Sequence, residues 1–235
     1  MTIPRVRIAP SPTGNHHVGT DRTALYYYLF AKKTGGKFIL RIEDTDLERS
    51  NLHYTENIYA GLKSMGLSWD EGPDIGGEYG PYVQSKRLDL YKEKAEDLIK
   101  KQHAYYCYCS QEELEQEKQL ASEKKENYLY SGKCRNLTET QKEIYQKEGR
   151  IPTIRFKVPQ KTIVLKDIVR GEVTFDTSLI GDFIIQKSDG TASYNFAVVV
   201  DDVGMKISHV IRGEDHISNT PKQMMVYEAL EEPIP

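Results

Sequence analysis

The chain has 235 residues, of which 38% are apolar and 29% charged, and its net charge is −3. This length suits one large domain or two modest ones, and the composition excludes a wholly disordered or collagen-like chain. No apolar run approaches the roughly 18 residues that cross a bilayer. The three cysteines are too few for a secreted disulfide framework. We therefore expect a soluble, cytoplasmic protein without a membrane partner.

The first part of the chain predicts a strand, a helix and a second strand. The segments with these patterns are 5–9, 17–33 and 38–42. Val18, Leu25 and Leu29 fall on one side of the helix, and we expect that side to be buried. A β-α-β unit of this length places its two strands parallel, with a right-handed crossover.

Further helices and a group of short strands follow. Helical patterns occupy 58–65 and 88–98, the second with Ser85 as its predicted N-cap. Residues 111–126 are mostly Glu, Gln and Lys, which is typical of a solvated helix with little buried face. Short strand-like segments lie at 154–158, 162–165, 173–175 and 183–186. Together these features predict a β-containing insertion.

The last forty residues return to apolar runs that end in charged residues. Residues 196–200 lead into Asp201 and Asp202, and residues 209–212 form a second such run; we predict both as strands. A helix is expected from Thr220. The outline is an α/β nucleotide-type domain interrupted by an insertion.

The junction between the first strand and the first helix is the strongest candidate for a ligand site, because open parallel sheets bind ligands beyond the carboxyl ends of their strands. It contains neither a dinucleotide fingerprint nor a Walker loop with its lysine. His17, Gly19 and Thr20 open the helix, where free N–H groups and partial positive charge favour a phosphate. The alternative is that His17 only caps the helix.

Charged residues also follow the other strands. Glu43, Asp44 and Asp46 suit a cation or an ammonium group, or else form a solvated turn. Arg7 and Arg212 lie near the ends of two predicted strands and are able to converge on one anionic ligand. Bidentate recognition of a carboxylate explains the choice of arginine over lysine. An ion pair between strands is the alternative.

Six segments stand in a characteristic order: RIAPSPTG (7–14), HVGT (17–20), RIEDTD (41–46), GPD with GPYVQS (72–85), YNFAVVVDD (194–202) and VIRGEDH (210–216). In sequence and spacing they resemble the catalytic domain of glutamyl-tRNA synthetases. The resemblance implies an α/β fold, a Rossmann-type class I synthetase catalytic domain with a parallel sheet and flanking helices. Residues 1–82 and 191–235 would form this split domain, and residues 83–190 an inserted α+β domain that binds the tRNA acceptor stem.

The resemblance also implies roles for single residues. His17, Gly19 and Thr20 match the catalytic ATP signature, with His17 and Thr20 facing phosphates and Gly19 the adenine. Asp215 falls near the expected ATP ribose. The residues that match the amino-acid pocket are Arg7, Ser11, Glu43, Tyr194 and Arg212. In this pocket Glu43 suits the substrate ammonium group, and the arginines suit its carboxylates.

The implied chemistry is attack of the glutamate α-carboxylate on the α-phosphate of ATP bound with Mg²⁺, which gives glutamyl-adenylate and pyrophosphate. Transfer to the 3′ end of tRNA(Glu) follows. Such reactions need positioning and charge stabilisation more than a protein nucleophile. The implied partners are L-glutamate, ATP and tRNA(Glu), and we expect a monomer.

Two elements of the family pattern do not appear. A second ATP signature resembling Lys-Met-Ser-Lys-Ser would follow the last helix, but the sequence reaches Pro235 without it. The anticodon-binding domain is also absent. We therefore expect a fragment of a longer enzyme that binds ATP and glutamate but has weak or no adenylation activity, since losing one electrostatic donor costs about 10²–10³ in rate.

Cys107, Cys109 and Cys134, together with Tyr130, resemble the zinc site of some family members. Structural zinc normally takes four Cys or His ligands, and no histidine follows Cys134 here. Related shorter enzymes use a Tyr-x-x-x-Cys arrangement, which Tyr130 and Cys134 match. Two interpretations stay open: a zinc site, or a metal-free hairpin with remnant cysteines, which the missing histidine slightly favours.

Other functions stay open beside glutamate charging. One is a glutamyl-Q tRNA(Asp) synthetase-like enzyme, although residues 212–221 look more like the full-length synthetase. A glutaminyl enzyme is disfavoured, because two arginines in the pocket suit an anionic side chain better than an amide. A non-catalytic tRNA-binding module would bind tRNA without affinity for glutamate or ATP.

Overall fold

The computed structural model describes residues 3–15, 17–46 and 49–235. The chain divides into two compact units, which are treated separately. The first comprises Met1–Leu90, Ala197–Asn219 and Glu231–Pro235, and the second comprises Tyr91–Phe196 and Thr220–Leu230. These divisions lie near the domain limits expected at 82/83 and 190/191, except that residues 220–230 group with the second unit.

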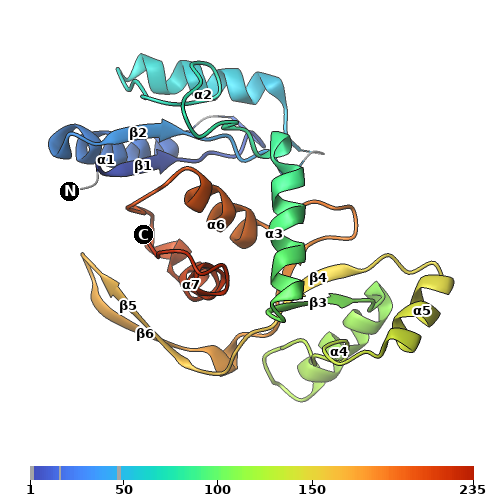
Figure 1. Ribbon diagram of the computed structural model, residues 1–235. Helices are drawn as coiled ribbons and strands as arrows, with labels where there is room; N and C mark the ends of the chain where they lie inside the picture. The colour runs from blue at the N-terminus through green and yellow to red at the C-terminus, as the bar shows by residue number, and fades with distance from the viewer. Residues whose placement is uncertain (1–2, 16, 47–48) are drawn as a thin grey trace. The chain divides into compact units, whose positions relative to one another are not determined.

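The first unit is built on a β-α-β element, as the sequence predicts (Figure 1). Strands β1 (Arg5–Ile8) and β2 (Lys37–Leu40) pair in parallel, and α1 (Val18–Thr34) connects them. Helix α2 (Leu52–Ser64) packs into the same core, where its Ile58 meets buried residues of β1, β2 and α1. The loop between β1 and α1 therefore leaves from the carboxyl end of a buried strand.

The buried side of α1 differs from the predicted one. The residues that the helix buries are Ala24, Tyr27 and Ala31. The side that we expected to be buried is exposed, with Val18 at 80%, Leu25 at 38% and Leu29 at 54%. Two alanines let the helix backbone approach the core closely, and the Tyr27 hydroxyl finds polar partners inside it. The apolar spacing is therefore misleading, because small residues and a paired tyrosine decide which side is buried.

Two of the predicted strands in the last part of the chain are not strands. Residues 196–202 belong to helix α6 (Tyr194–Gly204), and residues 207–213 form no regular element. Every residue of 196–202 is buried, so an apolar run here fits either a buried strand or a buried helix. In a strand, the side chains of Asp201 and Asp202 would point to opposite faces of a sheet. In helix α6, both side chains instead point into one buried region.

A short helix and a long one follow α2 in the chain, and the division between the two units falls within the long one. They are η1 (Gln84–Lys86) and α3 (Leu88–Lys100), and α3 buries Tyr91, Ala95 and Leu98 as predicted. Ser85 is not the N-cap of α3, because it lies inside η1. Its backbone N–H and hydroxyl donate to the Asp44 carboxylate at 2.8 and 2.7 Å, so Asp44 fixes this turn.

The second unit contains the predicted β-rich insertion. Strands β3 (Ala104–Cys107), β4 (Thr153–Phe156) and β7 (Ile184–Gln186) form an antiparallel sheet, and β5 (Thr162–Asp167) pairs with β6 (Gly171–Asp176) as a hairpin. Besides most of α3 and the start of α6, its helices are α4 (Gln111–Glu123), α5 (Glu139–Lys147) and α7 (Thr220–Ala229). Helix α4 buries no residue, as its composition predicts. Among the described residues, no helix is both long and apolar enough to cross a membrane.

Candidate active site

The first candidate feature is the start of α1, which borders a cavity of about 280 Å³. The cavity is lined by residues of the β1–α1 loop, the first turn of α1 and one side chain of α2: Pro10, Ser11, Thr13, Gly14, Asn15, His17, Thr20 and Ile58. The first N–H groups of a helix lack intrahelical partners and carry partial positive charge. The cavity can therefore accept an anionic group such as a phosphate.

His17 is the N-cap of α1. Its backbone is extended, and its imidazole Nδ1 accepts the Gly19 N–H at 3.2 Å. A Cβ atom at Gly19 would lie 3.0 Å from two atoms of this ring, so the glycine leaves the space in which the imidazole turns back over the helix. The structure thus brings Ser11, His17 and Thr20 to one cavity and places Gly19 against His17. The capping role and a role toward a ligand are compatible for His17.

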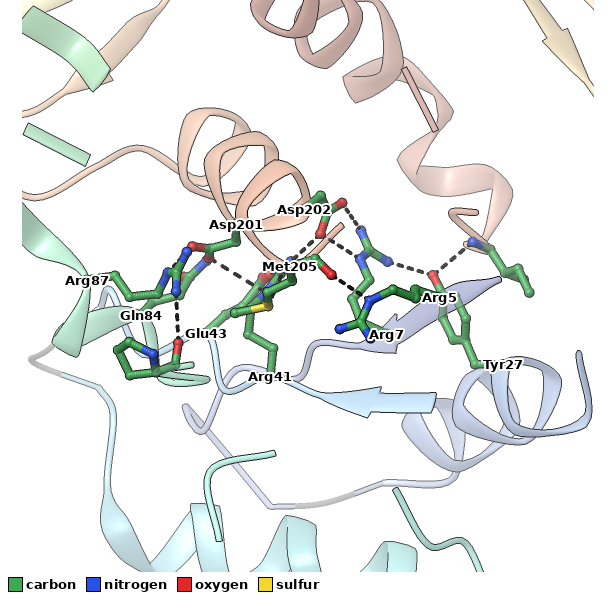
Figure 2. A network of polar contacts seen from close by, with 12 residues as sticks. Arg5, Arg7, Tyr27, Arg41, Glu43, Gln84, Arg87, Asp201, Asp202 and Met205 are labelled. Carbon is green, nitrogen blue, oxygen red and sulfur yellow. Dashed lines mark hydrogen bonds and ion pairs between the residues drawn. The ribbon is translucent and has the colours of Figure 1, made fainter. Parts of the chain in front are cut away.

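A buried ionic network joins β1, the end of β2 and α6 (Figure 2). Arg7 donates through Nε and Nη2 to the two carboxylate oxygens of Asp202, at 3.0 and 3.1 Å. Arg41 donates through Nη1 to Asp202 at 2.6 Å and through Nη2 to Glu43 at 2.8 Å. Arg41 and Asp202 are 0% and 1% exposed. Arg7 and Glu43, two residues of the predicted glutamate pocket, are therefore connected through Arg41 and Asp202.

Asp201 holds the other side of the network. It accepts from Arg87 Nε at 2.6 Å and from Gln84 Nε2 at 2.7 Å, and its carboxylate lies 3.7 Å from Arg41 Nε. Three guanidinium groups thus face three carboxylates, those of Glu43, Asp201 and Asp202. Buried charges are tolerated when they are paired and hydrogen-bonded in this way.

The two carboxylates bonded to Arg41 respond differently to burial. Burial alone would raise the pKa of Asp202, but the charges of Arg7 and Arg41 outweigh it, so the pKa of Asp202 is lowered. For Glu43 burial is stronger than the attraction of Arg41, and its pKa is raised. Asp202 is therefore ionised. For Glu43, the neighbouring positive charge does not fully offset the cost of burying its ionised form.

The other predicted site residues, two of the glutamate pocket and one of the ATP site, lie in three places. The segment that carries Arg212 is anchored by the neighbouring Ile211 N–H, which donates to the Tyr27 hydroxyl at 2.9 Å. Asp215 lies in η3 (Glu214–Asn219), with a side chain that is 79% exposed. Tyr194 is 45% exposed, begins α6 and belongs to the second unit.

Sequence reasoning missed several residues that organise this region. They are Tyr27, Arg41, Arg87, Asp201 and Asp202. The two aspartates directly after the apolar run could have indicated this network, because carboxylates that are buried with such a run need cations as partners. No comparable signal marks Tyr27 among the 16 tyrosines of the chain.

The second unit contains a cluster of three cysteines and one tyrosine. The Sγ atoms of Cys107, Cys109 and Cys134 all lie within 4.8 Å of one another. The Tyr130 hydroxyl is 3.3 Å from Cys107 Sγ and 3.2 Å from Cys109 Sγ, and it accepts the Cys134 N–H at 3.2 Å. Arg155 Nε donates to Cys107 Sγ at 3.3 Å, which places a buried positive charge beside the thiols. The cluster can hold a metal ion.

A comparison of the sequence with known protein families shows the family to which the chain belongs. The sequence pattern of the catalytic domain of class I tRNA synthetases (E and Q) matches residues 4–235. The chain belongs to this family. The assignment agrees with the α/β fold.

Individual relatives of this class I synthetase domain are known at high similarity. A glutamate–tRNA ligase of Carboxydothermus hydrogenoformans is 60% identical over 98% of this chain and 48% of that enzyme. One of Bacillus subtilis is 54% identical, with the same coverage of both chains. A crystal structure of a glutamate tRNA ligase from Elizabethkingia meningosepticum, in complex with its amino acid, superimposes with a TM-score of 0.93 at 40% identity. That match covers all of this synthetase domain and 48% of the crystallised chain. The synthetase domain therefore spans about half the length of these relatives.

Proposed function

We propose that this chain binds L-glutamate and ATP and forms glutamyl-adenylate, as the catalytic part of an enzyme that charges tRNA(Glu). One observation of the structure supports the glutamate site above all others. The Tyr27 hydroxyl binds Arg7 directly and also binds the backbone N–H of Ile211, so one atom joins Arg7 to the segment that leads into Arg212. Paired guanidinium groups suit a substrate with two carboxylates. The names of the 54–60% identical relatives support the same substrate.

Five of the predicted residues have a definite task in the proposed reaction. Arg7 and Arg212 bind the substrate carboxylates. The substrate ammonium group lies beside Glu43 as a second cation, and its charge lowers the raised pKa of Glu43. His17, Thr20 and the positive end of the α1 dipole face the ATP phosphates, and Mg²⁺ bound with the nucleotide would supply further charge neutralisation there. A glutamate α-carboxylate oxygen attacks the α-phosphorus of ATP, and the bond to pyrophosphate breaks. The 3′-terminal hydroxyl of tRNA then attacks the adenylate carbonyl, and AMP leaves.

Isothermal titration calorimetry with L-glutamate, L-glutamine, ATP and tRNA(Glu), each added separately, tests this function. We expect glutamate and ATP each to bind, and glutamate to bind at least about tenfold more tightly than glutamine, because an amide leaves buried arginine N–H groups poorly paired. Binding of tRNA without either small molecule would contradict the proposal and indicate a tRNA-binding module. Equal or better binding of glutamine would overturn the substrate assignment alone.

The cysteine–tyrosine cluster of the second unit is proposed to hold one structural Zn²⁺. Four ligands at usual Zn–S distances form a tetrahedron with edges of about 3.8 Å between sulfur atoms. The 3.6 Å between Cys109 Sγ and Cys134 Sγ fits this edge, and the Tyr130 hydroxyl, 3.2 Å from Cys109 Sγ, is close enough to serve as the fourth ligand. Arg155 offsets part of the negative charge of three thiolates. Such a site ties β3 to the loop that carries Cys134.

Metal analysis of protein purified without added zinc is expected to find about one equivalent per chain. Tyr130→Phe should lower zinc affinity at least about tenfold in a competition with a chromophoric chelator. Tyr128→Phe is the matched control, because the Tyr128 hydroxyl binds Glu117 instead of a cysteine. Absence of zinc from the unaltered protein would remove the site. Equal affinities for Tyr130→Phe and Tyr128→Phe would remove Tyr130 as a ligand.

A further inference from the structure

The hydroxyl of Tyr27 occupies a special place in the first unit. Tyr27 lies in the middle of α1 and is 1% exposed. Its oxygen accepts Arg7 Nη1 at 2.6 Å and the Ile211 N–H at 2.9 Å (Figure 2). A phenolic oxygen has two lone pairs, and both are used here. One atom of α1 therefore fixes a side chain of β1 and the segment that leads into Arg212.

Arg7 is held from a second direction as well. Its Nε and Nη2 groups donate to Asp202, while Nη1 donates to Tyr27. A guanidinium group has five N–H donors in one plane. Among the described residues, the contacts of Arg7 occupy three of them, which leaves one N–H on each terminal nitrogen for a ligand. Because Asp202 and Tyr27 fix the plane, these two donors are pre-oriented and lose little freedom when a carboxylate binds.

Arg212 directly follows Ile211 in the chain, and its positive charge acts on Tyr27 together with that of Arg7. Burial is the largest influence on the pKa of Tyr27 and raises it, while the positive charges of Arg7 and Arg212 both lower it. The Tyr27 oxygen is the negative end of the hydroxyl dipole, and it offsets part of the positive charge of Arg7, which it binds directly. The same pair of cations attracts a carboxylate strongly and a neutral amide much less.

We propose that Tyr27 is a positioning residue that sets Arg7 and Arg212 for a ligand carboxylate, and so determines the preference for a dicarboxylic amino acid over its amide. This inference rests on the proposed function. Tyr27 itself touches no substrate in this account. It acts by orienting Arg7 and by fixing the backbone at Ile211.

Tyr27→Phe tests the proposal, because it removes the hydroxyl and keeps the buried ring. The matched control is Tyr28→Phe on the same helix, where the ring packs on Phe38 and no described hydrogen bond uses the hydroxyl. Calorimetric titrations of the 235-residue chain with L-glutamate, L-glutamine and ATP compare the two variants with the unaltered protein. For Tyr27→Phe we expect glutamate to bind about tenfold more weakly, with affinities for glutamine and ATP within about twofold of the original. Tyr28→Phe should leave all three affinities unchanged.

The possible results separate this inference from the proposed function. If the unaltered protein binds ATP but no glutamate, the proposed function fails and the inference fails with it. If glutamate binding is normal and Tyr27→Phe keeps it within twofold, the inference alone is overturned. Equal losses for glutamate, glutamine and ATP would show a purely structural role of Tyr27 and would also overturn it. Only a selective loss of glutamate affinity supports the positioning role.

Discussion

Replacing Asp202 by asparagine is expected to lower the free energy of unfolding of the first unit by about 3–5 kcal/mol. The Asp202 carboxylate is 1% exposed and binds two buried guanidinium groups, those of Arg7 and Arg41. An asparagine keeps the size of the side chain but removes its charge and points an NH₂ group at a guanidinium. Two buried cations then lose their common counter-charge. Urea denaturation followed by the fluorescence of Trp69, the single tryptophan and a residue of the same unit, measures the change.

Asp215→Asn is the matched control, because that carboxylate is 79% exposed. It should change the stability by less than about 0.5 kcal/mol. The pH dependence gives a second check. Because the pKa of Asp202 is lowered on folding from its usual 3.8, its contribution is fully present above that value and is lost as the pH falls through the folded-state pKa. Asp202→Asn should flatten this acid limb; an unchanged limb, or equal stability losses in both variants, would contradict the network's role.

Replacing Arg212 by methionine is expected to weaken glutamate binding about 30-fold or more. In the proposed site Arg212 pairs with a substrate carboxylate, and methionine keeps much of the apolar stem while removing all five donors. ATP binding should change by less than about twofold, since the phosphate-binding features lie at the start of α1. Calorimetric titration with glutamate and with ATP measures both effects on one preparation.

Arg22→Met on α1 serves as the control for losing a positive charge from the same unit, because Arg22 is exposed. It should leave glutamate affinity within about twofold, since exposed charges are screened by water and salt. A similar loss in both variants would show that general electrostatic attraction, and not a specific contact, accounts for the effect. Unchanged glutamate binding in Arg212→Met would remove Arg212 from the site.

The buried network explains how a site rich in charge stays rigid. Asp201 and Asp202 sit on consecutive positions of α6, yet each binds different guanidinium groups and both lie close to Arg41. With three cations against three anions the region carries no excess charge of its own. Arg7 can then offer its remaining donors to a ligand without moving. Pre-oriented donors of this kind would suit the proposed adenylation, because such a reaction depends on positioning and charge stabilisation.

Much of the local structure was predictable because it depends on short-range patterns. The strand, turn and helix between residues 5 and 34 follow from alternation, a Pro- and Gly-rich turn and the glycines after the helix. Capping boxes at Ser110 and Thr138 start α4 and α5, and this local signal was available although we did not predict α5. In contrast, the run at 196–202 was ambiguous, because a fully buried segment shows no period that separates a helix from a strand.

The sequence by itself determined the family resemblance, the β-α-β element and the residue types of the candidate sites. Only the tertiary structure decided which of these residues meet. Arg7 and Asp202 are 195 positions apart, and Tyr27 and Ile211 are 184 apart, so no local pattern can specify their pairing. The buried side of α1 was settled in the same way, by the close approach of Ala24 and by partners for the Tyr27 hydroxyl. Periodicity shows which residues share a face, but burial of a polar group depends on finding its partner, and that partner comes from elsewhere in the chain.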